Sequence, residues 1–216
     1  GQPMNYFASW SGGKDCCLAT YRASLEWAPP HCLLCMLTEG ERVSRSHGLP
    51  RALLAAQAEA IGVPVRFASA TWNDYERVFI EQLRGLADEG VQAGVFGDID
   101  LDEHREWEER VCAQAGMSAH LPIWRETHEA LIDEFLREGF RAVIVTVRLD
   151  AVPEDLLGEP LSPTTVAKLR DLGVDVSGEG GEFHTAVLDG PLFSRPVDCS
   201  PTGVHRLPGY ATLKWE

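Results

Sequence analysis

Hydrophobic positions in the first 125 residues alternate between short apolar runs and stretches with a helical period. Short runs are typical of buried strands, and apolar residues three or four positions apart are typical of one face of a helix. The ranges expected as strands are 5–10, 31–38, 63–68 and 94–97. The ranges expected as helices are 14–27, 49–61 and 101–116, with a further helix striped by Tyr75, Phe79, Leu83 and Leu86. This alternation predicts a Rossmann-like α/β fold, a parallel twisted sheet with helices on both faces.

The pattern changes after residue 125. Leu131 and Phe135 belong to the stripe of a helix that Gly139 ends, and the β-branched run 142–147 predicts a buried strand. Glycine and proline then recur often, with strands expected near 183–188 and 211–215. We therefore expect a first domain over residues 4–125 and a smaller C-terminal α+β lobe over residues 126–216.

Composition and charge exclude several classes of function for this chain. The chain is 44% hydrophobic and 24% charged, as ordinary globular proteins are. No stretch approaches the roughly 20 apolar residues of a membrane span, and no secretory signal opens the sequence. The formal net charge of −14 repels a phosphate backbone, which argues against a nucleic-acid partner. Six cysteines in a chain with a sizeable core are expected as free thiols in the reducing cytoplasm.

Residues 11–15 read Ser-Gly-Gly-Lys-Asp and lie between a predicted strand and a predicted helix. Two glycines let the backbone turn tightly and bring N–H groups close to a ligand. The helix start adds unpaired N–H donors and a partial positive charge. With the Ser11 hydroxyl and the Lys14 ammonium, this segment predicts a cradle for pyrophosphate. The alternative is a glycine-rich turn without a ligand.

Residues 177–185 form a second unusual segment, Ser-Gly-Glu-Gly-Gly-Glu-Phe-His-Thr. Its two acids, Glu179 and Glu182, are set among three glycines directly before a predicted strand. Carboxylates in such a loop can hold Mg²⁺, bind ammonium or act as a base. The alternative is an acidic, solvated surface turn.

Both segments resemble the motifs of a known family. Residues 11–15 resemble the PP-loop motif S-G-G-K-D-[ST] of ATP pyrophosphatases, with Cys16 in place of the usual Ser or Thr. Residues 179–193 resemble the E-G-G-E-[FY]-x-T…D-G-P-x-F signature of the diphthine–ammonia ligase family. Residues 97–109 are similar to the family segment G-A-I-x-S-D-Y-Q-R-x-R-x-E, with Asp98 in place of Ala, and residues 122–124 match its P-L-W. The resemblance covers almost the whole chain.

The resemblance implies a PP-loop nucleotide-binding domain over residues 4–125 and a substrate-binding lobe over residues 126–216. It implies cleavage of ATP to AMP and pyrophosphate, with an amide formed from ammonia and a small-molecule or protein-borne carboxylate. ATP and Mg²⁺ are the expected cofactors, with Asp15 as the expected Mg²⁺ ligand. The expected ATP-binding residues are Ala8, Ser9, Ser11, Gly12, Gly13, Lys14, Asp15, Cys16, His47, Gly97 and Asp98. The expected acceptor residues are Glu179, Gly181, Glu182, His184 and Thr185.

His47 and Asp98 are in the first set because they follow predicted strands, and ligands of open α/β sheets bind at the carboxyl ends of strands. His104 lies on a charged helix and is expected to be solvated or structural. The tryptophans expected to pack, and not to form a stacking platform, are Trp10, Trp72, Trp107 and Trp124.

Other functions stay open at this point. A PP-loop sulfur transferase acting on RNA would use Cys16, or the pair Cys32 and Cys35, as its sulfur carrier. A corrinoid-related amidating enzyme of the same family is suggested by His184, where other members carry Glu. A nucleotide-sensing module without catalysis is the third alternative. The sequence also leaves a homodimer open.

Overall fold

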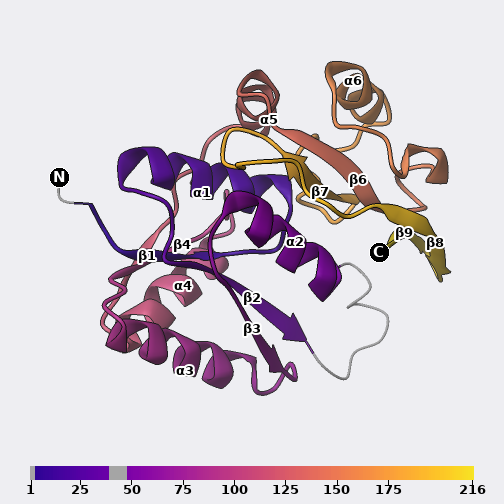
Figure 1. The fold of residues 1–216 in the computed structure, drawn as a ribbon. Helices are drawn as coiled ribbons and strands as arrows, with labels where there is room; N and C mark the ends of the chain where they lie inside the picture. Colours follow the sequence, from indigo (N-terminus) through magenta and orange to yellow (C-terminus); the bar gives the residue numbers. More distant parts are fainter. Residues whose placement is uncertain (1–2, 39–47) are drawn as a thin grey trace. The chain divides into compact units, whose positions relative to one another are not determined.

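The computed structural model describes residues 3–38 and 48–216, and Figure 1 shows how the chain runs. These residues fall into two compact units. The first contains the described parts of Gly1–Ser11 and Asp15–Arg45, together with Gly62–Arg125. The second contains Gly12–Lys14, the described part of Ser46–Ile61, and Glu126–Glu216. The centre of the glycine loop therefore groups with the C-terminal residues.

The first unit holds a five-stranded sheet with the order β3-β2-β1-β4-β5, parallel throughout. The strands are β1 (Tyr6–Ser9), β2 (Cys32–Thr38), β3 (Val65–Ala70), β4 (Ala93–Val95) and β5 (Ser118–His120). The chain adds β2 and β3 on one side of β1 and then β4 and β5 on the other. Such a change of side leaves a crevice at the carboxyl ends of the central strands, where open α/β sheets bind ligands.

Helices cover both faces of this sheet. The helices are α1 (Lys14–Glu26), α3 (Tyr75–Asp88) and α4 (Asp102–Gln114), with α1 on one side and the other two opposite (Figure 1). Phe7 of β1 packs in one core cluster with Phe79 of α3 and Val111 of α4. The neighbouring Tyr6 donates its hydroxyl to the carbonyl of Ala28, just beyond α1. Because successive strand residues point to opposite faces, these contacts confirm the predicted parallel sheet with two covered faces.

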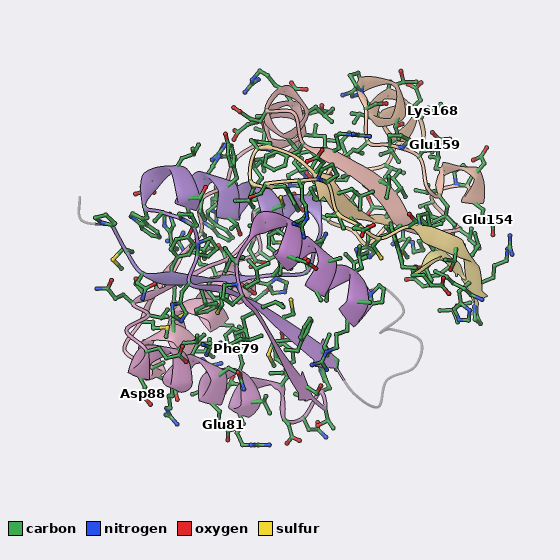
Figure 2. The ribbon with its side chains drawn as sticks, viewed as in Figure 1. Phe79, Glu81, Asp88, Glu154, Glu159 and Lys168 are labelled. Carbon is green, nitrogen blue, oxygen red and sulfur yellow. The ribbon has the colours of Figure 1, made fainter. Side chains whose placement is uncertain are left out.

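Helix α3 illustrates how the pattern positions an element. Phe79, Leu83 and Leu86 are buried, whereas Glu81 and Asp88 are exposed. Figure 2 labels Phe79 on the inner side of the helix and both acids on its outer side. The apolar stripe read from the sequence is therefore the stripe that faces the sheet.

The second unit holds an antiparallel sheet with the order β7-β6-β9-β8. Its strands are β6 (Arg141–Arg148), β7 (Phe183–Asp189), β8 (Pro201–Leu207) and β9 (Tyr210–Trp215). Its helices are α2 (Arg51–Ile61), α5 (His128–Arg137), α6 (Pro163–Asp171) and the 3₁₀ turn η2 (Glu154–Leu156). Leu53 of α2 packs in a cluster with Val145 of β6 and Ala186 of β7. The expected C-terminal α+β architecture is confirmed.

The structure corrects the sequence-based expectations at several places. Helix α2 begins at Arg51 and not at residue 49, and the elements β5, α6 and β8 were not predicted. Trp10 is buried as expected, but Trp72 is 64% exposed, so the packing prediction for Trp72 was wrong. None of the helices in the described part of the chain has the length and apolar character needed to cross a bilayer.

Candidate active site

The glycine loop connects β1, which ends at Ser9, to α1, which begins at Lys14. Gly12 has a φ of 84°, a conformation that favours glycine. A Cβ at this position would lie 2.6 Å from the side-chain oxygen of Gln57, which is closer than real Cβ atoms come. Both the backbone angle and the close packing therefore require glycine here. The expected residues Ala8 and Ser9 lie at the carboxyl end of β1, with Ala8 buried.

Strand β7 and helix α2 hold the backbone of the loop within the second unit. The Gly12 carbonyl accepts hydrogen bonds from the Val187 N–H and from Gln57 Nε2, each at 2.9 Å. Gln57 Nε2 also donates to the Val187 carbonyl at 2.9 Å. The Lys14 N–H donates to Thr185 Oγ1 at 3.1 Å. Thr185, expected on the acceptor side, thus contacts the loop backbone directly.

Lys14 brings the two motifs together. Its side chain is buried, at 6% exposure, and Nζ donates to the Ser177 carbonyl at 2.6 Å. The ammonium also lies 5.9 Å from the ring centroid of Phe183. Ser177 opens the acidic segment and Phe183 begins β7, so the cation of the first motif lies against the second motif.

Ser11 and Cys16 interact at the other part of the loop, within the first unit. Ser11 Oγ donates to Cys16 Sγ at 3.5 Å, and the Ser11 N–H points to the same sulfur at 3.4 Å. A Cβ on Gly97 would lie 2.7 Å from the Cys16 Cα and N atoms. The chain after β4 therefore passes directly against the first turn of α1, and only glycine leaves room for this approach. This contact places Gly97 next to Cys16, so two of the predicted site residues are neighbours.

Asp175, which sequence reasoning missed, organises the acidic loop. Asp175 Oδ1 accepts from the Ser177 N–H at 3.1 Å, and Oδ2 accepts from the Glu179 N–H at 3.2 Å. His128 Nδ1 lies 2.7 Å from Oδ1. Burial opposes ionisation of Asp175, but the hydrogen bonds from His128 and the two amides outweigh it and lower the pKa of this carboxyl. The signal for this role was the Asp-x-Ser spacing, which is typical of a side chain that binds the backbone two residues on.

Glu182 is the more enclosed of the two candidate acids. Its Oε2 accepts from the Asp175 N–H at 3.2 Å. Its Oε1 is buried and has no hydrogen-bond partner in the described part of the chain. Gly181 before it has a φ of 80°, while Glu179 is exposed and His184 on β7 is half-buried. A buried carboxylate oxygen without a partner costs free energy unless a ligand supplies one, which makes Glu182 Oε1 a candidate contact for a bound group.

Asp98 follows β4 and belongs to a cluster of titratable groups in the first unit. Its Oδ1 lies 3.1 Å from His104 Nδ1. Burial, followed by the hydrogen bond with Asp98, raises the pKa of Glu108 to about 10. The proximity of His104 to Asp98 was not foreseen from the sequence. His47, the remaining candidate, lies outside the described residues.

The described residues also bear on metals and thiols. Within residues 3–38 and 48–216, no three His, Cys, Asp or Glu side chains gather as a metal site. Mg²⁺ usually takes one or two protein carboxylates beside substrate phosphates, and Asp15 as its ligand stays a prediction. Burial raises the pKa of Cys32 to about 11 and that of Cys35 to about 12. Both thiols are therefore protonated at neutral pH.

Comparison with known proteins gives matches along the chain. Residues 4–119 match the family model of the diphthamide synthase N-terminal domain, and residues 127–207 match that of the diphthamide synthase C-terminal domain. The diphthine–ammonia ligase of Danio rerio is 27% identical over 179 residues, which cover 79% of this chain and 69% of that protein. The diphthine–ammonia ligases of Bos taurus and Homo sapiens are 32% and 31% identical over 133 residues. Each of these two matches covers 59% of this chain and about half of the relative.

Proposed function

Because the chain belongs to the diphthamide synthase family, whose N- and C-terminal domain models it matches in order, we propose that it is an ATP-dependent ligase that converts a substrate carboxylate into an amide with ammonia. The observation that carries the proposal is the hydrogen bond from Lys14 Nζ to Ser177. It supports a site in which a phosphate-binding loop works beside a carboxylate-rich loop.

The glycine loop serves the phosphates in this proposal. An oxygen of the substrate carboxylate attacks the α-phosphorus of ATP, and the bond to the β-phosphate oxygen breaks, so that pyrophosphate leaves. Ser11, Lys14 and the loop amides stabilise the charge that develops on the leaving group. Asp15 would hold Mg²⁺, which would supply further positive charge beside the phosphates.

The acidic loop serves the acceptor and ammonia. The nitrogen of ammonia attacks the activated carbonyl carbon, and AMP leaves as the amide forms. Glu179, Glu182 and His184 orient the acceptor or take the proton that the nitrogen loses. The buried and unpartnered Glu182 Oε1 supports this role.

The pair Cys32 and Cys35 favours amide formation over sulfur transfer. A sulfur carrier attacks as a thiolate, and the raised pKa values of Cys32 and Cys35 keep both thiols protonated. Persulfide formation on Cys16, or on either cysteine of the pair, during turnover would instead favour the transferase alternative.

The test is product analysis with a panel of carboxylated metabolites, corrinoids among them, as acceptors. We expect AMP and pyrophosphate, and exchange of labelled pyrophosphate into ATP with a true acceptor. Lys14→Ala and Ser11→Ala should each lower turnover about 100-fold, the usual effect of removing one donor to a developing charge. Lys168→Ala on α6 is the matched control and should leave turnover unchanged. Formation of ADP and phosphate, or full turnover by Lys14→Ala, contradicts the proposal.

The product assay, together with calorimetry of ATP binding, separates the role of the glycine loop from that of the acidic loop. Glu182→Gln should bind ATP–Mg²⁺ within about three-fold of wild type by calorimetry, yet lose at least about 100-fold in amide formation, because it removes a carboxylate that acts on the acceptor and not on ATP. Glu138→Gln, at an exposed position beyond α5, is the control. If Glu182→Gln loses ATP affinity as severely as Lys14→Ala does, the acidic loop belongs to the nucleotide site.

A further inference from the structure

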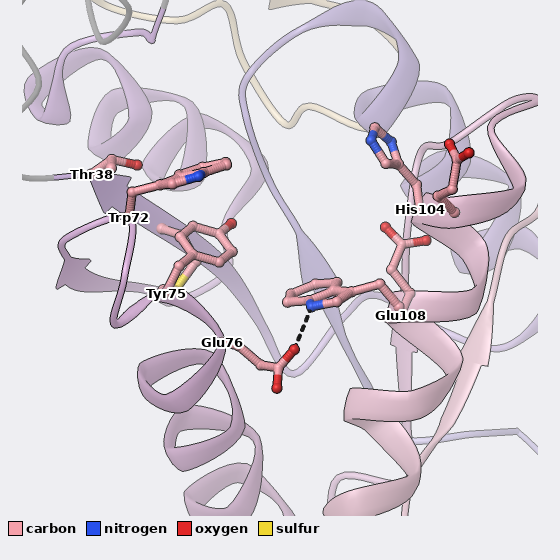
Figure 3. Close-up of a pocket in the computed structure, with 9 residues that line it drawn as sticks. Thr38, Trp72, Tyr75, Glu76, His104 and Glu108 are labelled. Atoms are coloured by element: carbon pink, nitrogen blue, oxygen red, sulfur yellow. Dashed lines mark hydrogen bonds between the residues drawn. The ribbon is translucent and has the colours of Figure 1, made fainter.

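Two glutamate side chains in the described part of the chain each bury an oxygen without a hydrogen-bond partner, Glu108 Oε1 and Glu182 Oε1. Glu108 belongs to the first unit, where it lines a cavity of about 630 Å³ at the starts of α3 and α4 (Figure 3). Glu182 belongs to the second unit, and its other oxygen, Oε2, accepts from the Asp175 N–H at 3.2 Å. The proposed function uses Glu182 but assigns no role in ATP binding to Asp175.

The buried ammonium of Lys14 depends on the direction of one carbonyl group. Only 6% of Lys14 is exposed, and its Nζ donates to the Ser177 carbonyl at 2.6 Å. Burying a cation costs free energy unless hydrogen bonds compensate for the lost water. A hydrogen bond from a charged donor is stronger than a neutral one, and it weakens when its geometry is poor. The direction of the Ser177 carbonyl therefore affects where the Lys14 ammonium lies.

Asp175 fixes this direction through the backbone of the acidic loop. The Ser177 carbonyl and the Gly178 N–H belong to one planar peptide group, so fixing the N–H also fixes the carbonyl. The Gly178 N–H donates to the Asp175 carbonyl at 2.9 Å. The Asp175 carboxylate accepts from the N–H groups on either side, that of Ser177 at 3.1 Å and that of Glu179 at 3.2 Å. Successive N–H groups of the loop thus bind to a single residue.

His128, the first residue of α5, holds Asp175 in turn. Its Nδ1 lies 2.7 Å from Asp175 Oδ1. Burial opposes ionisation of Asp175, but the hydrogen bonds from His128 and the two amides lower its pKa, so the side chain is a carboxylate at neutral pH. A carboxylate only accepts hydrogen bonds, so His128 donates in this contact. Contacts therefore run from His128 through Asp175 and Ser177 to Lys14, all within the second unit.

We propose that Asp175, held by His128, is a positioning residue that sets where the Lys14 ammonium lies in the glycine loop. It acts on the phosphates only through the Ser177 carbonyl and Lys14. The inference rests on the proposed function in one respect, the assignment of Lys14 as the phosphate-binding cation. It adds a control of ATP binding by the C-terminal lobe that does not involve the Glu182 carboxylate.

Trace acetylation with acetic anhydride reports the position of Lys14 without ATP or acceptor. The chain has three lysines, Lys14, Lys168 and Lys214, and the last two are exposed. Mass spectrometry of each digest therefore compares Lys14 with two internal references. In wild type the buried Lys14 should react more slowly than either reference.

Asp175→Asn keeps the size of the side chain but offers one acceptor oxygen in place of two. It should speed acetylation of Lys14 about ten-fold relative to the references, the change expected when a hydrogen bond to a charged group is lost. Asp171→Asn, at the exposed end of α6, is the matched control and should react as wild type does. Unchanged reactivity of Lys14 in Asp175→Asn overturns the proposal.

Calorimetry of ATP–Mg²⁺ binding without acceptor tests whether Asp175 acts through Lys14. Asp175→Asn alone should weaken binding about ten-fold. In the double variant with Lys14→Ala, the change at Asp175 should add nothing, because residues that act through one contact are not additive. Additive losses would show that Asp175 acts independently of Lys14, and they overturn the proposal.

Two variants of His128 separate positioning from a general loss of structure. His128→Leu removes the donor to Asp175 and should speed acetylation of Lys14, whereas His128→Asn keeps a side-chain N–H and should restore slow acetylation. Wild-type reactivity of Lys14 in His128→Leu overturns the proposal. Formation of ADP, with Lys14 reactivity that depends on Asp175, refutes the proposed function alone. Formation of AMP and pyrophosphate, with Lys14 reactivity that does not depend on Asp175, refutes this inference alone.

Discussion

Glu108 is a buried carboxyl group whose titration is tied to folding. Its pKa rises from an ordinary 4.5 to about 10, first because of burial and then because of the hydrogen bond with Asp98. Between these two pH values the folded chain keeps a proton that the unfolded chain has lost. The stability that this proton provides is present below the unfolded pKa and is lost as pH rises toward the folded pKa.

Glu108→Gln tests this link. The variant carries a neutral amide at every pH, so it should lose less stability than wild type between pH 5 and pH 8. Each pH unit between the two pKa values costs wild type up to about 1.4 kcal/mol. The fall in Tm over that interval should therefore be smaller in the variant by at least about 2–4 °C, the shift that roughly 1 kcal/mol causes in a chain of this size. Thermal melts of both proteins, with Glu109→Gln as control, measure the difference. Parallel pH profiles for wild type and Glu108→Gln would contradict the assignment of a protonated Glu108.

At the scale of the element, helix α5 depends on Thr127, the residue just before its first turn. The Thr127 side chain accepts from the Ala130 N–H at 3.2 Å and so satisfies one of the unpaired donors of the first turn. Thr127→Ala should cost about 1 kcal/mol and lower Tm by about 2–4 °C. Thr127→Ser keeps the oxygen and should retain most of the stability. If Thr127→Ala and Thr127→Ser have the same Tm, the capping hydrogen bond contributes nothing to stability.

The elements that the sequence predicted are those with a one-sided or fully apolar pattern. The stripe of α3 and the buried runs of β1, β2 and β6 were visible because burial alone explains their residues. The missed elements lack such a pattern. β5 has three residues, and β8 is largely exposed, with Gly203 and a bulge near Pro201. Helix α6 is short and begins with Pro163, amid frequent glycine and proline.

The candidate site was predictable to the extent that its chemistry is local in sequence. Both motifs are contiguous, and their glycines meet real backbone demands at Gly12 and Gly181. The residues that hold the glycine loop in place lie far from their partners in the sequence, and no local sequence pattern marks them. Gln57 reaches Val187, 130 residues away, through a buried amide. Only the folded chain identifies it as a partner of the glycine loop.

At the scale of the whole molecule, charge is the dominant property. The formal net charge is −14, with 33 acidic residues against 19 lysines and arginines. Many basic side chains already lie in surface ion pairs such as Arg170–Glu129 and Arg206–Glu154, which contribute little individually. The excess of negative charge repels itself over the surface.

Salt should therefore stabilise this protein. Raising NaCl from about 10 mM to 150 mM shortens the screening length from about 30 Å to about 8 Å. We expect Tm to rise by about 1–3 °C as the self-repulsion is screened. Melts in NaCl and in KCl distinguish screening from binding of one ion. A fall in Tm with either salt would show that the ion pairs outweigh the net charge.

The hydrogen bond between the Lys14 N–H and Thr185 joins residues 171 positions apart. A ribosome makes the chain from its N-terminus at about 5–20 residues per second, so the partner strand follows the loop after roughly 10–30 s. During that time the nascent chain carries its glycine loop without the strand that holds it. The proposed phosphate site therefore matures only when β7 has left the ribosome, well after the loop itself has been translated.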